Sequence, residues 1–140
     1  MKVICKQTTS EGFDLKEVTT VFSNNFDYSF GGHGLELGKE YIVMGMLLYK
    51  NSNCLYYLID VSGRPDWFPH LLFNTSENSL SYDWFVRVNN RGENGIYCVW
   101  GFDELCNSEK FYEQLMERDE QAMGIYFRRK IEIEKFLADI

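Results

Sequence analysis

The stretch that decides the expected fold is Tyr41-Ile-Val-Met-Gly-Met-Leu-Leu-Tyr49, followed by Lys50-Asn-Ser-Asn53 and then Cys54-Leu-Tyr-Tyr-Leu-Ile-Asp60. Two runs rich in aliphatic, aromatic and β-branched residues, which favour strands, flank four residues that favour turns. Two such runs joined by a short polar loop predict an antiparallel β-hairpin.

Further strand signals lie on both sides of this hairpin. Residues 1–9 alternate weakly between apolar and polar, and β-branched residues recur over 18–22. Downstream, strands are predicted over 81–88 and 96–100, separated by a turn rich in asparagine and glycine over 89–95. The first two-thirds of the chain is therefore expected to be mainly β.

Two segments on either side of the hairpin are predicted to be loops, turns or edge strands. The polar, aromatic and glycine-rich residues 23–34 predict a long loop or an edge strand. Trp67-Phe68-Pro69 predicts a short strand or turn that cannot be central in a sheet, because Pro69 has no N–H for a neighbouring strand.

From Asn107 onward the pattern becomes helical. Asn107 or Ser108 is a candidate N-cap for a helix, and Asp119 is a candidate N-cap for a second helix that runs to about Leu137. The first helix has an apolar stripe at helical spacing, made of Phe111, Tyr112, Leu115 and Met116.

Together these elements predict one α+β domain over residues 1–140, mainly β over 1–106 and helical over 107–140. The expected architecture is a bent antiparallel sheet of about five to seven strands, partly closed, with the C-terminal helices packed on it. The predicted core includes Tyr41, Val43, Leu58, Trp67, Phe68 and Phe111.

Composition narrows the class of partner. The net charge of −7 and the isoelectric point near 4.8 disfavour binding to nucleic acid or to anionic membranes and favour a basic protein partner. No apolar run approaches the ~20 residues of a membrane-spanning helix. The opening residues lack the apolar segment of a signal peptide, so we expect a cytoplasmic protein whose four cysteines are reduced.

Few residues are candidates for catalysis or metal binding. His33, within Gly31-Gly-His-Gly34, and His70, after Pro69, are the two histidines, and neither has the spacing of a metal-binding motif. We expect no metal, no cofactor and no enzymatic activity. Asp60 and Asp66 could pair across the intervening turn, although Asp at a turn usually bonds its own backbone.

The cysteines offer one further candidate. Cys5, Cys54 and Cys98 lie in apolar contexts that predict packing in the core. Cys106 lies near a predicted helix N-terminus, where the helix dipole would favour a thiolate, although the inert interpretation is preferred there as well.

Acidic residues gather near the first predicted helix. Glu109, Glu113 and Glu117 recur at intervals of four, which would place three like charges on one helical face. This pattern is typical of a solvated helix face and also of a surface that binds a basic partner. The candidate partner-binding residues are Asp103, Glu104, Glu109, Glu113, Glu117 and Glu120.

Part of the chain resembles a known barrel. The segments Leu35-Glu-Leu-Gly-Lys-Glu-Tyr-Ile-Val43, Tyr57-Leu-Ile-Asp60 with Gly63, and Trp67-Phe-Pro-His-Leu-Leu-Phe73 resemble the second half of an SH3-like barrel. The resemblance implies a partly closed barrel and, as one function, a protein or peptide interaction module. The chain lacks the Ala-Leu-Tyr-Asp-Tyr opening of signalling SH3 domains, so the resemblance does not extend to their proline-rich ligands.

The whole chain resembles small bacterial immunity proteins of polymorphic and contact-dependent toxin systems. The resemblance rests on size, acidity, aromatic richness and the order of barrel and helices. It implies a non-enzymatic protein that neutralises a cognate toxin, expected here to be a basic domain, by occluding it.

Overall fold

The computed structural model describes residues 1–9, 34–50, 54–81, 83–89 and 95–140. The elements of this part of the chain, in order, are β1 (Lys2–Cys5), β2 (Glu40–Ile42), β3 (Gly45–Tyr49), β4 (Leu55–Val61), β5 (Arg64–Pro69), the 3₁₀ turn η2 (His70–Leu72), β6 (Phe73–Glu77), β7 (Phe85–Val88), β8 (Ile96–Gly101), α2 (Asp103–Asn107), α3 (Phe111–Met116) and α4 (Glu120–Ala138).

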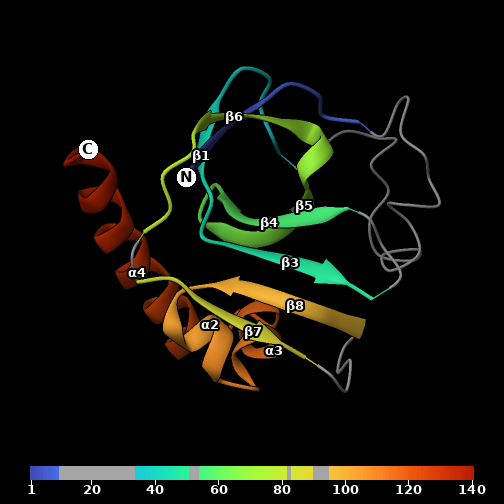
Figure 1. The fold of residues 1–140 in the computed structure, drawn as a ribbon, viewed down its shortest axis with the longest axis vertical. Coiled ribbons are helices and arrows are strands. Elements are labelled where there is room, and N and C mark those ends of the chain that lie inside the picture. Colours follow the sequence, from blue (N-terminus) through green and yellow to red (C-terminus); the bar gives the residue numbers. More distant parts are fainter. Residues whose placement is uncertain (10–33, 51–53, 82, 90–94) are drawn as a thin grey trace.

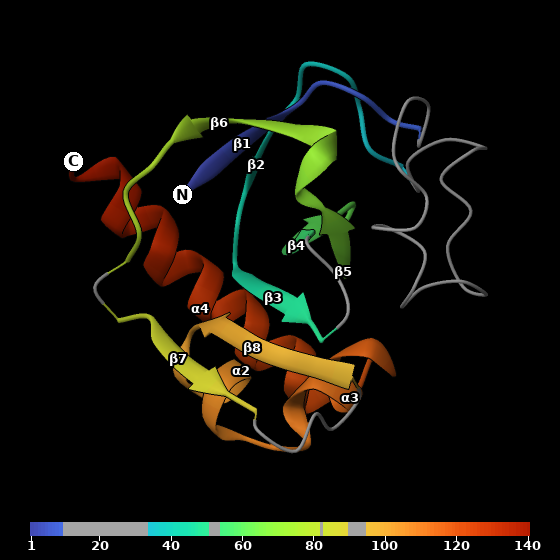
Figure 2. The ribbon, with the colours of Figure 1, turned by 45° about the vertical axis from the view of Figure 1, so that its right-hand side comes forward.

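The strands form two antiparallel sheets. One has three strands in the order β2-β1-β6, and the other has five in the order β5-β4-β3-β8-β7. Helices α2 and α3 lie on the side of the five-stranded sheet away from the three-stranded sheet, whereas α4 runs from that side until its C-terminal end lies near the N-terminus and β1 (Figures 1 and 2). The α+β prediction is confirmed. The described residues form two separate sheets and no closed barrel, so the expected single bent sheet is replaced by two.

The apolar run of residues 41–49 explains this division. Its first part, β2, pairs with β1, and its second part, β3, pairs with β4 and β8. At the corner between them, the Val43 N–H donates to the Met1 carbonyl and the Met44 N–H donates to the Leu58 carbonyl, at 3.0 and 2.8 Å. Because both corner side chains are fully buried, the run stays apolar while the backbone passes from one sheet to the other.

The predicted hairpin is confirmed, with Leu47 opposite Tyr56 in the β3–β4 pair. A second hairpin joins β4 to β5 through Ser62 and Gly63, whose φ angles are +51° and +80°. Positive φ at both central residues is typical of the two-residue turns that match the twist of a hairpin. Strand β5, which ends at Pro69, lies at the edge of its sheet as predicted.

Two clusters of buried side chains hold the layers together. One fills the space between the five-stranded sheet and the helices, and the other lies between the two sheets. All six predicted core residues are buried, at 7% exposure or less. Trp67 and Phe111 belong to the first cluster, and Tyr41 and Phe68 belong to the second.

The helical region contains three helices in place of the expected two. Asp119 caps α4 as predicted, since its carboxylate accepts a hydrogen bond from the Ala122 N–H at 3.0 Å. Asn107 and Ser108 are not N-caps: they end the short helix α2, and Lys110 precedes α3 without a side-chain cap. The burial of Leu105 against the sheet accounts for this additional helical turn.

Some predictions fall on residues outside the described part of the chain: the strand over 18–22, His33, and nearly all of the predicted loops over 23–34 and 89–95. Among the helices described, none combines the length and the apolar character required to cross a bilayer.

Candidate functional site

The candidate site is the acidic segment, defined as residues 103–120, which runs from α2 through α3 to the start of α4. It carries seven acidic side chains and only two basic ones, Lys110 and Arg118. The structure places two of the six candidate residues on α2, one in the turn before α3, one within α3, one at its C-cap and one at the start of α4.

The expected ladder of three glutamates on one helical face is therefore wrong. Helix α3 begins at Phe111 and ends at Met116, so only Glu113 lies within it. Glu109 precedes the helix in a turn, and Glu117 follows it as the C-cap. All three side chains are exposed. Glu117 keeps the helical spacing to Glu113, since its N–H donates to the Glu113 carbonyl at 2.9 Å, whereas Glu109 lies outside the helix.

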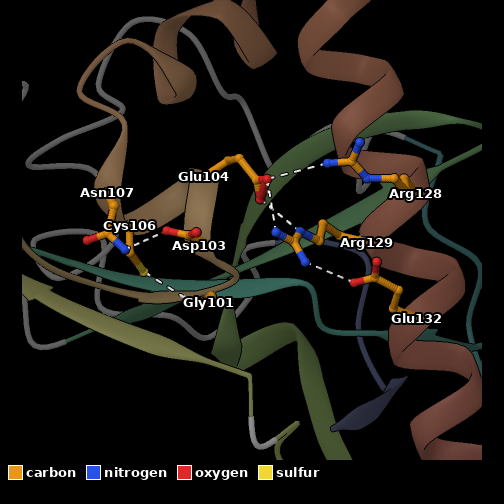
Figure 3. Close-up of polar contacts among 8 residues, drawn as sticks. All are labelled: Gly101, Asp103, Glu104, Cys106, Asn107, Arg128, Arg129 and Glu132. Atoms are coloured by element: carbon orange, nitrogen blue, oxygen red, sulfur yellow. Dashed lines mark hydrogen bonds and ion pairs between the residues drawn. The ribbon is translucent and has the colours of Figure 1, made fainter.

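Glu104 differs from the other candidates because its charge is neutralised within the protein. Its two carboxylate oxygens accept hydrogen bonds from Nε and Nη2 of Arg129, at 2.8 and 3.0 Å, and Arg128 lies 3.5 Å away (Figure 3). This two-point contact lowers the pKa of Glu104 and raises that of Arg129. Glu104 therefore fastens α2 to α4 and is withdrawn as a partner-binding residue.

Arg118, one of the two basic residues of the segment, binds backbone carbonyls. Its guanidinium Nη1 donates to the backbone carbonyls of Pro65, on β5, and Leu115, the latter at 3.3 Å. Arg118 has a φ of +62°, in the left-handed region, which lets the chain turn from α3 towards α4. The positive charge is thus used to bind the sheet edge.

Besides Asp119, which caps α4, five carboxylates of the segment are exposed. Asp103 accepts a hydrogen bond from the side-chain amide of Asn107 at 2.7 Å, as Figure 3 shows, and this neutral contact leaves its charge uncompensated. Within the described residues, no ion pair involves any of the five, which are Asp103, Glu109, Glu113, Glu117 and Glu120.

The thiol of Cys106 is not a nucleophile in this environment. It is fully buried, and its Sγ lies 3.4 to 3.7 Å from the carbonyl oxygens of Phe85, Gly101 and Val99. Burial raises its pKa to about 11, which outweighs any effect of the short helix α2. All four cysteines are buried, as predicted, and none of them forms a disulfide.

The other candidate groups for catalysis have structural partners. Nδ1 of His70 lies 3.2 Å from both the N–H and the carbonyl of Leu55. The Asp60 carboxylate binds Tyr126 and Lys130 of α4, at 3.0 and 2.7 Å, whereas Asp66 accepts from the Trp67 N–H. Asp60 and Asp66 therefore bind different partners. The described residues contain no group of three side chains able to hold a metal ion.

A cavity of about 300 Å³ lies between α4 and the residues before β7, and no pattern in the sequence predicted it. Its lining mixes aromatic side chains, including Trp84 and Phe102, with both positive and negative groups. Arg129 forms part of the wall, but Glu104 and Glu132 already neutralise it. The lining carries three acidic and two basic side chains, so its small excess of charge does not by itself indicate a ligand.

Comparison with protein-family models, with curated proteins and with solved structures found no match to this chain.

Proposed function

We propose that this chain is a non-enzymatic binding protein of the toxin-immunity type, which neutralises a basic protein partner by covering it with the acidic segment. The observation that carries the proposal is the set of five exposed carboxylates left without an ion pair in the described structure.

Only some charges of the acidic segment have partners within the protein, and the choice of which ones supports the proposal. Arg129 binds Glu104, which is partly buried, and Arg118 binds backbone carbonyls. Both contacts strengthen the fold and leave the most exposed acids uncompensated. Repulsion between Glu113 and Glu117, the one pair that keeps helical spacing among the three glutamates of the expected ladder, costs a few tenths of a kcal/mol, which cations of a partner would relieve.

Electrostatics also predicts how binding would proceed. A net charge of −7 attracts a basic protein over a distance of about one Debye length, roughly 8 Å at physiological salt. Such attraction raises the association rate, and the rate falls as salt increases. Apolar contacts would then set the lifetime of the complex.

The test uses the protein encoded next to this chain's gene, expressed as a possible toxin in a bacterial host and purified for kinetics. We expect co-expression of the chain to restore growth. We also expect association to slow by about tenfold or more between roughly 0.02 M and 0.5 M ionic strength. Replacing Glu109, Glu113 and Glu117 with lysine should slow association at low salt by a similar factor.

A matched variant separates a local effect from a change in total charge. Replacing Glu36, Glu134 and Asp139 with lysine changes the net charge equally at exposed positions outside the acidic segment. This control should slow association much less. Equal rates for the two triple variants, or no binding to the neighbouring protein, would refute the proposal.

A further inference from the structure

Strand β7 is an exposed apolar edge. It is the last strand of the five-stranded sheet, and within the described residues no strand pairs with its outer side (Figures 1 and 2). Phe85, Val86 and Val88 are 47%, 56% and 51% exposed. Exposed apolar edges are rare in soluble proteins because they attract further strands.

The hydrogen bonds to β8 show which backbone groups are free. Arg87 pairs with Val99 and Val88 with Cys98, and the N–H of the next residue, Asn89, donates to the Tyr97 carbonyl at 2.8 Å. Antiparallel strands alternate between residues that bond the neighbouring strand and residues that do not. Phe85 and Arg87 therefore face β8, whereas Val86 and Val88 direct their N–H and C=O groups outward.

The opposite edge of the same sheet is protected. Strand β5 contains Pro65 and Pro69, and the guanidinium of Arg118 binds the Pro65 carbonyl. Proline and charged groups are the usual means of blocking an edge. Strand β7 has no proline, and the side chains of Phe85, Val86 and Val88 on it are apolar and exposed. The sheet is thus closed at β5 and open at β7.

The charges beside β7 favour one kind of partner. Exposed Asp83 lies two residues before the strand, and exposed Asp103 lies two residues after Gly101, the residue that pairs with Phe85. Both acids therefore lie near the Phe85 end of β7. A second copy of this chain would bring another net charge of −7 against the first, so charge disfavours a homodimer.

We propose that β7 is a docking edge, where an extended strand of a basic partner protein joins the five-stranded sheet. The backbone of the partner strand would form hydrogen bonds with Val86 and Val88, and its aliphatic side chains would cover those two valines. Its lysine or arginine side chains would lie near Asp83 and Asp103. This inference rests on the proposed function and names the contact that would hold the partner in place.

The test uses a synthetic peptide, acetyl-Lys-Val-Thr-Val-Lys-Val-Arg-amide, and amide hydrogen exchange followed by NMR on the full chain. At about 1 mM peptide, exchange of the Val86 and Val88 amides should slow about tenfold or more, which corresponds to a Kd of about 0.1 mM or below. The amides of Phe85 and Arg87 should change little, because they already bond β8. A peptide with glutamate in place of lysine and arginine should have no effect.

Two variants block the edge in different ways. Val86→Pro removes an N–H that the sheet does not use, so the ladder to β8 should persist while peptide binding is lost. The double variant Val86→Lys and Val88→Lys keeps every backbone group and repels a basic strand. Unchanged denaturant midpoints would show that each variant folds. If Val86→Pro does not fold, the double variant provides the test.

Several results would overturn the docking edge. These are unchanged exchange at Val86 and Val88 with the basic peptide, equal protection by the acidic peptide, and binding retained by a folded edge variant. Protection that grows with protein concentration without peptide would identify a second copy as the occupant and overturn it as well. If the edge variants still protect cells from the neighbouring toxin while the glutamate triple variant does not, the docking edge fails and the proposed function stands.

Discussion

Replacing Glu104 with glutamine tests whether its contact with Arg129 holds the helices together. The substitution keeps the size of the side chain and removes the charge that accepts two hydrogen bonds from the guanidinium. Arg129 also binds Glu132, at 3.0 Å, so Glu132→Gln is a matched control on the same arginine.

Burial determines the expected magnitudes. The side chains of Glu104 and Arg129 are 22% and 24% exposed, whereas that of Glu132 is 49% exposed. Removing one partner of a buried pair costs about 3–5 kcal/mol, and an exposed pair contributes about 0–1 kcal/mol. The partly buried Glu104 lies between these limits, so its replacement should lower the free energy of unfolding by about 1–2 kcal/mol. Glu132→Gln should cost less than about 0.5 kcal/mol.

The effect should depend on pH in a defined direction. Hydrogen bonds from Arg129 lower the pKa of Glu104 in the folded protein. The stabilisation is therefore fully present above the usual glutamate pKa of about 4.3 and is lost as the pH falls through the folded-state value. The difference between wild type and Glu104→Gln should stay constant from about pH 7 to about pH 5 and shrink below the usual glutamate pKa of about 4.3.

Urea unfolding followed by tryptophan fluorescence would measure these differences, with unchanged slopes showing that the same surface unfolds in each variant. The reasoning fails if Glu104→Gln and Glu132→Gln cost the same at neutral pH. It also fails if the cost of Glu104→Gln stays constant as the pH falls below the usual glutamate pKa.

Two further predictions concern the helical region. Asp119→Ala should lower the free energy of unfolding by about 1 kcal/mol, because it removes the cap that accepts from Ala122; urea denaturation measures this, and a cost near zero would contradict it. Cys106 should resist a thiol reagent at neutral pH in the folded protein and react in denaturant, because burial raises its pKa to about 11; fast labelling of Cys106 in the folded chain, located by mass spectrometry, would exclude this environment.

Local patterns in the sequence determined a large part of the fold. The β3–β4 hairpin, the edge position of Pro69 and the Asp119 cap follow from residues a few positions apart. The six core residues follow from their apolar character. These features depend on backbone preferences and on transfer of apolar groups from water, which act wherever the residue occurs.

The candidate site was only partly predictable. The sequence marked residues 103–120 as acidic, but it could not show that Glu104 binds Arg129, which lies 25 positions away. Nor could it show that Arg118 turns towards Pro65, 53 positions away. Which charges stay exposed depends on which elements pack together. The packing of the whole core determines those neighbours.

The tertiary structure alone decided how the sheets divide and which edge stays open. The sequence pattern of residues 41–49 predicts one strand, yet its two parts pair with partners in different sheets. Strand β7 is an edge because β3 takes the other side of β8. Strand pairing joins backbone groups that are nearly identical in every residue, so the partner of each strand is selected by topology and by long-range packing.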